Sequence, residues 1–459
     1  MNARSLTGWS WPLARPYRQP ALYLSIYAAL VLVPLAMSLG LPLYDRPWFQ
    51  AAITALNIAG LSAMLWQFWL SSRSRHLADG WGLDPALAMH RRVGEWIAIF
   101  FFLHPFLILL PRAWVAGQLA LDDLWLSLIQ KSIRTGMFAW ALLIVWTLVA
   151  IAKSKARLSY EAWRYSHAVG FLAVATLGVL HAMDVGRHGQ SQPLFNTLWI
   201  AGLAAAWAVT LYGLIGRPGS QAAHPFVVES VSRAGISDWT VRLRHDGTEP
   251  FQFTAGQFVW LDASGKSWQR SEHPFSISSA PADLPVLELV VRELGDFTAS
   301  LDRLQPGRKV TVHGPYGQFT LAGRSAKGVI LLAGGAGIGP MLSLLREQVA
   351  TSPRIPIRLL YGNRRGDQMV AVPELQDLER NLPDFSTGFA LEEPDPAFAE
   401  AYHGRMDRAF LAAHLPDAAK AVGWLAFVCG PPAMVQATVA QLRALGWSAD
   451  RIVYERFGF

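Results

Sequence analysis

The hydrophobic and polar positions divide this chain into two halves with different patterns. Before residue 216 the apolar residues form long runs, and after it short alternating segments are separated by Gly and Pro. A run of about 20 apolar residues can cross a bilayer as a helix. Six segments approach that length: 21–43, 50–70, 93–110, 133–151, 165–182 and 195–215. We therefore predict a short cytoplasmic segment at 1–20, a six-helix, all-α membrane bundle over 21–216, and a soluble remainder.

Basic residues between the predicted spans indicate the direction of each span. They gather in the N-terminal segment, in the second and fourth connections, and after the last span: Arg4, Arg15, Arg18, Arg73, Arg75, Arg91, Arg92, Lys153, Lys155, Arg157, Arg164 and Arg217. Loops rich in Lys and Arg remain on the cytoplasmic side. Both termini and the soluble half are therefore expected in the cytoplasm, with the bundle in the plasma or inner membrane. This topology also explains the net charge of +7 without nucleic acid as a partner.

Two pairs of histidines lie in the third and fifth hydrophobic segments. Thirteen residues separate His90 from His104, and thirteen separate His167 from His181. Such a step returns to nearly the same helix face and climbs roughly 21 Å. Because the topology makes these two spans parallel, His90 lies level with His167 near the cytoplasm, and His104 with His181 near the far side. The spacing predicts two six-coordinate b-type haems, which suit electron transfer.

Other roles for these histidines have different consequences. A single intramembrane histidine is usually a hydrogen-bonding or proton-relay group, and a transporter using four such relays would bind no haem. Equal spacing on parallel helices favours the haem interpretation. The sequence contains no Cys-x-x-Cys-His, so covalent haem attachment is excluded, and Cys429 is the only cysteine, which excludes an intramolecular disulfide.

The region 221–323 has the pattern of a small antiparallel β-barrel. Alternating strands are predicted at 227–232, 240–244, 257–261 and 287–293. Between them lies His273-Pro274-Phe275-Ser276, and the last strand is followed by Gly295-Asp296-Phe297-Thr298 at the start of a helix. Free N–H groups and a hydroxyl at a helix start suit a pyrophosphate. Residues 314–317 are predicted to close the region as a tight turn.

From residue 324 the pattern changes to strands alternating with helices, typical of an α/β nucleotide-binding domain over 324–459. The apolar strand 329–333 leads into a glycine-rich loop, Gly334-Gly335-Ala336-Gly337-Ile338-Gly339-Pro340, and a helix through Arg346. Such a loop brings backbone close to a phosphate, although by itself it can also be a structural turn. Strands 357–361 and 424–428 end at Arg364 and Arg365, and at Cys429-Gly430-Pro431. Ligands in such sheets bind beyond these strand ends.

These motifs resemble those of the ferredoxin–NADP reductase family. Together with the four-histidine bundle, the chain from about residue 21 resembles the NADPH-oxidase and ferric-reductase superfamily, particularly its compact bacterial members. The resemblance implies FAD, two b haems and NADPH as cofactors, with NADH as the alternative donor. It further implies that Phe275 packs on the flavin, that Ser276 bonds near its reactive nitrogen, and that the terminal Phe459 stacks on it.

The same resemblance assigns the remaining site residues. Gly295 and Thr298 would hold the FAD pyrophosphate, and His273 stands where many relatives have an arginine. Arg364 and Arg365 would bind the 2′-phosphate of NADPH, since guanidinium groups suit phosphate; a solvated basic loop is the alternative. Cys429 would shape the nicotinamide site, or serve as a plain buried thiol.

The implied reaction is transfer of electrons from NADPH through FAD and both haems to an acceptor outside the cytoplasm. Dioxygen would make the protein a superoxide-producing oxidase, and a ferric or cupric chelate would make it a metalloreductase. A third possibility is a membrane subunit that donates electrons to an extracytoplasmic protein, although no protein partner is required by the sequence. Related eukaryotic oxidases carry a further histidine where this chain has Ile108, which weakens the case for a dedicated oxygen site.

Overall fold

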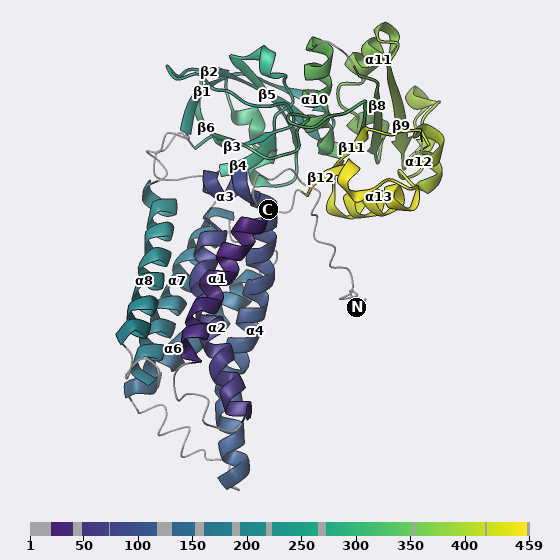
Figure 1. The fold of residues 1–459 in the computed structure, drawn as a ribbon. Helices are drawn as coiled ribbons and strands as arrows, with labels where there is room; N and C mark the ends of the chain where they lie inside the picture. Colours follow the sequence, from purple (N-terminus) through teal and green to yellow (C-terminus); the bar gives the residue numbers. More distant parts are fainter. Residues whose placement is uncertain are drawn as a thin grey trace. The chain divides into compact units, whose positions relative to one another are not determined.

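The computed structural model describes residues 20–39, 48–72, 74–116, 131–151, 160–185, 193–216, 223–264, 272–351, 355–417 and 420–456. The chain divides between residues 219 and 220 into a helical unit and a reductase unit (Figure 1). The terminal Phe459 lies outside the described residues, so its predicted contact with the flavin stays a prediction.

Long helices make up the helical unit. They are α1 (Pro20–Ser38), α2 (Trp48–Leu70), the short α3 (Arg75–Gly80), α4 (Leu83–Ala116), α6 (Lys131–Ile151), α7 (Tyr160–Val185) and α8 (Pro193–Leu211), which continues as a π-helical turn, Tyr212–Gly216. Within the described part of the chain, five segments are long and apolar enough to cross a membrane: Pro20–Ser38, Trp48–Leu70, Ile133–Ile151, Ala162–Val185 and Pro193–Leu214. The predicted third span lies inside α4, which is not among these five, so a sixth crossing stays a prediction.

The helical unit is apolar on the outside as well as inside. Its core contains Ile58 and Leu65 from α2 and Trp199 from α8, whereas Phe138 and Ile200 are more than half exposed. A helix that is apolar on all sides is suited to lipid. Where α6 meets α7, the indole of Trp146 fills the space beside Gly170, and a glycine there allows such close helix contact.

A six-stranded antiparallel sheet forms the first part of the reductase unit. Its strands are β1 (Ala223–Gly235), β2 (Asp238–His245), β3 (Phe258–Asp262), β4 (Glu272–Ser276), β5 (Val286–Arg292) and β6 (Lys309–Tyr316), in the order β4-β3-β6-β1-β2-β5. A single bridge, Ile277 to Leu289, links the chain after one edge strand to the other edge strand. Closure into a full barrel stays a prediction.

The predicted turn at 314–317 was placed too early. Residues Gly314 to Tyr316 continue β6, and Tyr316 pairs with Phe258 of β3. Gly317 follows the strand with a φ of 102°, which favours glycine, and the chain turns only at residues 322 and 323. A Gly-Pro pair locally favours a turn. Here the hydrogen bonds between β6 and β3 keep the pair in an extended strand.

The second part of the reductase unit is a parallel sheet covered on both faces. Its elements are β7 (Gly328–Gly334), α10 (Ile338–Ala350), β8 (Ile357–Asn363), α11 (Val372–Asn381), β9 (Phe385–Leu391), β10 (Tyr402–His403), α12 (Arg408–His414), β11 (Trp424–Gly430), α13 (Pro432–Ala444) and β12 (Ile452–Arg456). The strand order is β10-β9-β8-β7-β11-β12, and all neighbours are parallel.

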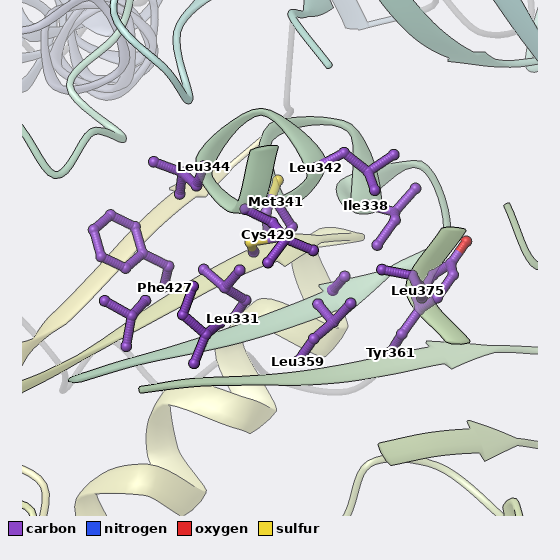
Figure 2. Close-up of a cluster of buried hydrophobic side chains, with 14 of the residues drawn as sticks. Leu331, Ile338, Met341, Leu342, Leu344, Leu359, Tyr361, Leu375, Phe427 and Cys429 are labelled. Atoms are coloured by element: carbon purple, nitrogen blue, oxygen red, sulfur yellow. The ribbon is translucent and has the colours of Figure 1, made fainter. Parts of the chain in front are cut away.

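The core between this sheet and α10 consists of apolar side chains from alternate strand positions. Leu331, Leu359 and Phe427 from the sheet meet Met341 and Leu342 from the helix (Figure 2). A second cluster on the opposite face includes residues of α12 and α13. Because both faces are covered, the strands are apolar along their whole length, which is why the predicted strands at 329–333, 357–361 and 424–428 were recognisable in the sequence.

Candidate functional site

Two loops meet where the strand order of the parallel sheet reverses. From β7 the chain continues outward to β8 on one side and pairs with β11 on the other, and ligands bind beyond the strand ends at such a point. The loop after β7 begins at Gly334 and passes directly against the loop after β11. A side chain at Gly337 would collide with the backbone carbonyl of Cys429, and one at Gly430 would stand 3.1 Å from Gly334. The glycines therefore allow the two predicted nucleotide loops to touch.

Cys429 lies with its side chain in the hydrophobic core beneath α10. It is fully buried and packs in the same cluster as Leu331 and Met341 (Figure 2). Gly430 and Pro431 follow it and face the glycine-rich loop: Pro431 Cδ lies 3.2 Å from the position of a Cβ on Gly334. It is thus the backbone of Cys429 that lies at the candidate nucleotide site.

Arg292, which belongs to none of the sequence motifs, stands beside the glycine-rich loop. Its guanidinium donates to the fully buried Asp238 at 2.9 and 3.0 Å and to Asn363 Oδ1 at 3.3 Å. A side chain on Gly335 would collide with this guanidinium. The sequence does mark the position, since Arg292 closes an apolar strand just before Gly295, but only the fold brings it to the loop. Arg292 places a fixed positive charge where a nucleotide phosphate is expected.

Arg364 and Arg365 follow β8, beside the same loop, and each already has an acidic partner. Arg364 Nε donates to Glu393 Oε1 at 2.8 Å, and Arg365 pairs with Asp367. Both guanidinium groups are more than half exposed. Exposed pairs of this kind are weak, so a phosphate can compete for either arginine.

Contacts between aromatic rings hold the flavin motif against the predicted pyrophosphate turn. His273 and Phe275 lie on β4, and Phe297 lies on α9 (Asp296–Ala299). The His273 ring stacks on Phe297 with centroids 4.0 Å apart and planes at 13°, and Phe275 is 6.0 Å from Phe297. Thr298 Oγ1 accepts from the backbone N–H of Gly295 at 3.0 Å. Thr298 therefore shapes the turn, whose first-turn N–H groups are the ones suited to an anion.

The flavin motif and the nucleotide loop come into direct contact. Ser276, which follows Pro274 and Phe275 on β4, is buried, and its Cβ lies 3.6 Å from the position of a Cβ on Gly339. Gly339 and Pro340 belong to the first turn of α10. Glu455 of β12 pairs in register with Cys429 and is also buried, and its Oε1 would stand 3.0 Å from a Cβ on Gly317. Ser276 thus meets Gly339, and Glu455 lies beside both Cys429 and Gly317.

Buried polar contacts fasten α10 to the antiparallel sheet. The Arg346 guanidinium donates to Glu288 Oε1 at 2.7 Å, to the carbonyl of Ser278 at 3.0 Å, and to both carboxylate oxygens of Glu374. Burial alone would lower the pKa of Arg346, but its hydrogen bond to Glu374 and the negative charge of Glu288 outweigh burial, so the pKa is raised. The guanidinium stays charged at every accessible pH. Ser343 Oγ adds a bond to Ser279 O at 2.7 Å.

The helical unit brings the predicted histidine pairs together across α4 and α7. The rings of His90 and His167 have centroids 6.3 Å apart and planes at 72°. His167 lies between Trp163 and Phe171, at 5.2 and 4.7 Å, one helical turn to either side. His104 and His181 are close enough to interact electrostatically. His90 and His167 therefore face each other across α4 and α7, and His104 and His181 are neighbours on the same two helices; their roles as ligands stay a prediction.

The described residues also leave nitrogen atoms available in these pairs. Nδ1 of His90 and Nδ1 of His104 are buried without a hydrogen-bond partner among the residues that the structure describes. A bond between a metal ion and an imidazole nitrogen is about 2 Å long. Two such bonds in line, plus the distance from each nitrogen to the centre of its ring, place the two ring centroids roughly 6 Å apart. The 6.3 Å separation of the His90 and His167 rings fits two imidazoles that share one metal ion. Aromatic neighbours such as Phe101 at 6.1 Å from His104 suit an apolar macrocycle.

Comparison with known protein families yields three matches in chain order. Residues 56–178 match the ferric reductase like transmembrane component, 228–321 the oxidoreductase FAD-binding domain, and 331–440 the oxidoreductase NAD-binding domain. The first match includes all of the segment from His90 to His167, and the second includes the flavin motif.

Individual relatives are reductase components of oxygenase systems. The chain is 33% identical over 225 residues to the propane 2-monooxygenase reductase component of Mycolicibacterium goodii, covering 47% of this chain and 63% of the relative. It is 31% identical over 211 residues to the alkene monooxygenase ferredoxin–NAD(+) reductase component of Xanthobacter autotrophicus, covering 45% and 62%. A solved cytochrome P450 reductase from Amycolatopsis matches with 28% identity and a TM-score of 0.45 over 51% of this chain and 69% of that one. The chain spans less than two thirds of the length of both curated relatives.

Proposed function

We propose that this chain moves electrons across a membrane, because it is an NAD(P)H-dependent oxidoreductase of the NADPH-oxidase and ferric-reductase superfamily. A ferric-reductase-like membrane domain is joined in it to FAD- and NAD-binding domains. The donor is cytosolic NADPH, and the acceptor is dioxygen outside the cytoplasm, which leaves as superoxide. One observation carries the proposal: His90 and His167 face each other at a separation that suits a shared metal ion, in a chain that also has a complete reductase unit.

At the reductase end, this chain's residues hold donor and flavin side by side. The backbone at 334–339 and at 429–431 would support the nicotinamide nucleotide, and the Arg292 guanidinium, which is paired with Asp238, would donate a hydrogen bond to a phosphate beside Gly335. Phe275 and Ser276 face the flavin ring, while the turn from Gly295 to Thr298 holds its pyrophosphate. Because Ser276 of the flavin motif contacts Gly339 of the nucleotide loop, these two segments would hold a bound flavin and a bound nicotinamide next to each other, as hydride transfer requires.

NADPH is preferred over NADH in this proposal because two guanidinium groups are within reach of an adenosine 2′-phosphate. Arg364 and Arg365 are paired only through exposed contacts with Glu393 and Asp367. A bidentate phosphate contact is stronger than an exposed ion pair. The phosphate therefore displaces the carboxylate from Arg364 on binding.

In the helical unit, His90 with His167 and His104 with His181 are the proposed axial ligands of two b haems. Bound there, the haems would supply one-electron carriers spaced along the bundle, while the flavin would supply the change from two-electron to one-electron chemistry. The protein holds each imidazole in place: Trp163 and Phe171 flank His167. Phe100 and Phe101 flank His104.

The first test is the haem content of purified protein and of His181→Ala, read from reduced-minus-oxidised spectra and pyridine haemochrome. We expect two b haems per chain in the natural protein and one in the variant, with flavin reduction by NADPH unchanged. Two haems in the variant would refute the histidine pairing. Matched replacement of His76, an exposed histidine of α3, is the control and leaves both haems in place.

The acceptor is tested by aerobic NADPH oxidation with FAD added. Cytochrome c reduction that superoxide dismutase suppresses supports dioxygen, whereas rapid anaerobic reduction of a ferric or cupric chelate with little superoxide supports a metalloreductase.

A second candidate, transfer to a separate protein, is favoured by the named relatives, which are reductase components. Slow rates with both small acceptors would support it, and a protein fraction that raises the rate would identify the partner.

A further inference from the structure

Helix α6 carries none of the four histidines, yet it contacts α7 beside both histidines of that helix. Trp146 Nε1 donates to the carbonyl of Ser166, the residue before His167. Ten residues earlier on α6, Gly136 lies against the ring of His181. Because the order of these contacts is reversed along the two chains, α6 and α7 run antiparallel. The helix without ligands thus supports α7 at both histidine levels.

The contact at Gly136 is close enough to determine where the His181 ring stands. A Cβ built on Gly136 would lie 2.6 Å from both Nδ1 and Cε1 of His181 and 2.8 Å from its Cγ. Non-bonded carbon atoms prefer about 3.5–4.0 Å. The ring therefore lies almost against the backbone of α6, and any side chain larger than hydrogen would move it by several tenths of an ångström or more.

The same contact also orients the ring. The three atoms nearest to Gly136 form the Nδ1 edge of the imidazole. Nε2 is on the opposite edge, so it is directed away from α6. His104 on α4 is the imidazole with which His181 interacts electrostatically. The backbone of α6 thus turns the Nε2 edge of His181 away from α6, and Nε2 would be the nitrogen that binds a metal ion shared with His104.

We propose that Gly136 is a positioning residue for the second haem site, because the missing side chain lets the His181 ring retreat against α6 far enough to leave room for an iron between it and His104. The inference rests on the proposed haem ligation by these two histidines. A free histidine ring could rotate away from a methyl group at low cost. A ring bound through Nε2 cannot, since its position is set by the metal.

Gly136→Ala is the test, and haem stoichiometry with electron paramagnetic resonance of the low-spin ferric haems is the readout. We expect haem to fall from two per chain toward one, or the signal of one haem to shift while that of the other stays unchanged. Flavin reduction by NADPH stays at the level of the natural protein. Gly94→Ala is the matched control: it lies on α4, four residues after His90, and a Cβ there meets nothing within 4 Å. This control keeps both haems and both signals.

A double-mutant cycle separates this role from general helix packing. In a His181→Gly background the ring that the methyl group would strike is absent, so adding Gly136→Ala leaves the remaining haem and the melting temperature unchanged. If Gly136→Ala still removes the remaining haem in that background, Gly136 has a packing role and the inference is wrong.

Two haems with unchanged signals in the single variant would also overturn the inference while leaving the proposed function intact. Purified natural protein without any b haem would overturn the proposed function and this inference together.

Discussion

Arg346→Ala should detach α10 from the antiparallel sheet and destabilise the reductase unit. The guanidinium has three carboxylate or carbonyl partners: Glu288 on β5, the Ser278 carbonyl in the segment after β4, and Glu374 on α11. Its side chain is 23% exposed, against 14% for Glu288 and 34% for Glu374. Removal leaves the mostly buried Glu288 with only the half-exposed Arg242 as a cationic partner, at 3.5 Å, and breaking a buried pair costs about 3–5 kcal/mol.

The Glu374 half of this network contributes less because solvent screens it. Exposed pairs are worth about 0.2–1 kcal/mol, and the Glu288 pair is itself partly exposed. We therefore expect a loss of about 2–4 kcal/mol in the free energy of unfolding. In a unit of this size, 1 kcal/mol shifts Tm by about 2–4 °C, so Tm should fall by roughly 5–15 °C.

The assay is thermal release of FAD from the full-length protein in detergent, followed by flavin fluorescence. Arg405→Ala is the control, because that side chain is 82% exposed and pairs with Glu392; its Tm should change by less than about 3 °C. Equal shifts for Arg346→Ala and Arg405→Ala would refute the claim that α10 is fastened through Arg346. Arg346→Lys should recover only part of the lost stability, since a lysine ammonium cannot reproduce the planar set of N–H donors of the arginine guanidinium.

Three further changes test the nucleotide site and the pH dependence. Arg292→Ala should raise the dissociation constant for NADPH about 10–100-fold, the equivalent of one charge-assisted hydrogen bond; equilibrium titration measures it, and unchanged affinity would contradict the phosphate contact. Glu393→Gln should release Arg364 and raise the NADPH-to-NADH ratio of kcat/KM up to about fivefold, with a constant ratio as the contrary result. The N–H of Phe410 and the Tyr402 hydroxyl hold the pKa of Asp407 below its ordinary 3.8. That stabilisation is complete above the unfolded-state pKa and is lost as pH falls through the folded-state one, so Asp407→Asn should lower Tm at pH 7, and the difference should shrink in acid below 3.8.

The site residues that the sequence did not reveal all act through long-range contacts. Arg292 reaches Gly335 and Asn363, 43 and 71 positions later, and Glu455 reaches Cys429 only because β12 pairs with β11. Gly136 meets His181 across two helices. No periodicity or motif records such pairs, since each residue is ordinary in its local context.

The sequence alone determined what depends on local physical chemistry. Runs of apolar residues indicate helices that suit a membrane, because a spanning helix must satisfy its backbone internally and present apolar side chains outward. Apolar strand runs and glycine-rich loops revealed the α/β sheet, and equal spacing placed His90 with His167 on facing helices. Strand β6 escaped it, because pairing with β3 overrides the turn preference of Gly314 and Pro315.

Only the tertiary structure decided which of these groups meet. It places Ser276 against Gly339, buries the Cys429 side chain in the core while its backbone faces the nucleotide loop, and pairs Arg364 with Glu393. The physical reason is that these contacts are chosen by packing of whole layers: side chains far apart in sequence must fill one core at close density. Whether a charged residue or a glycine contributes to a site therefore depends on which residues the packing places next to it.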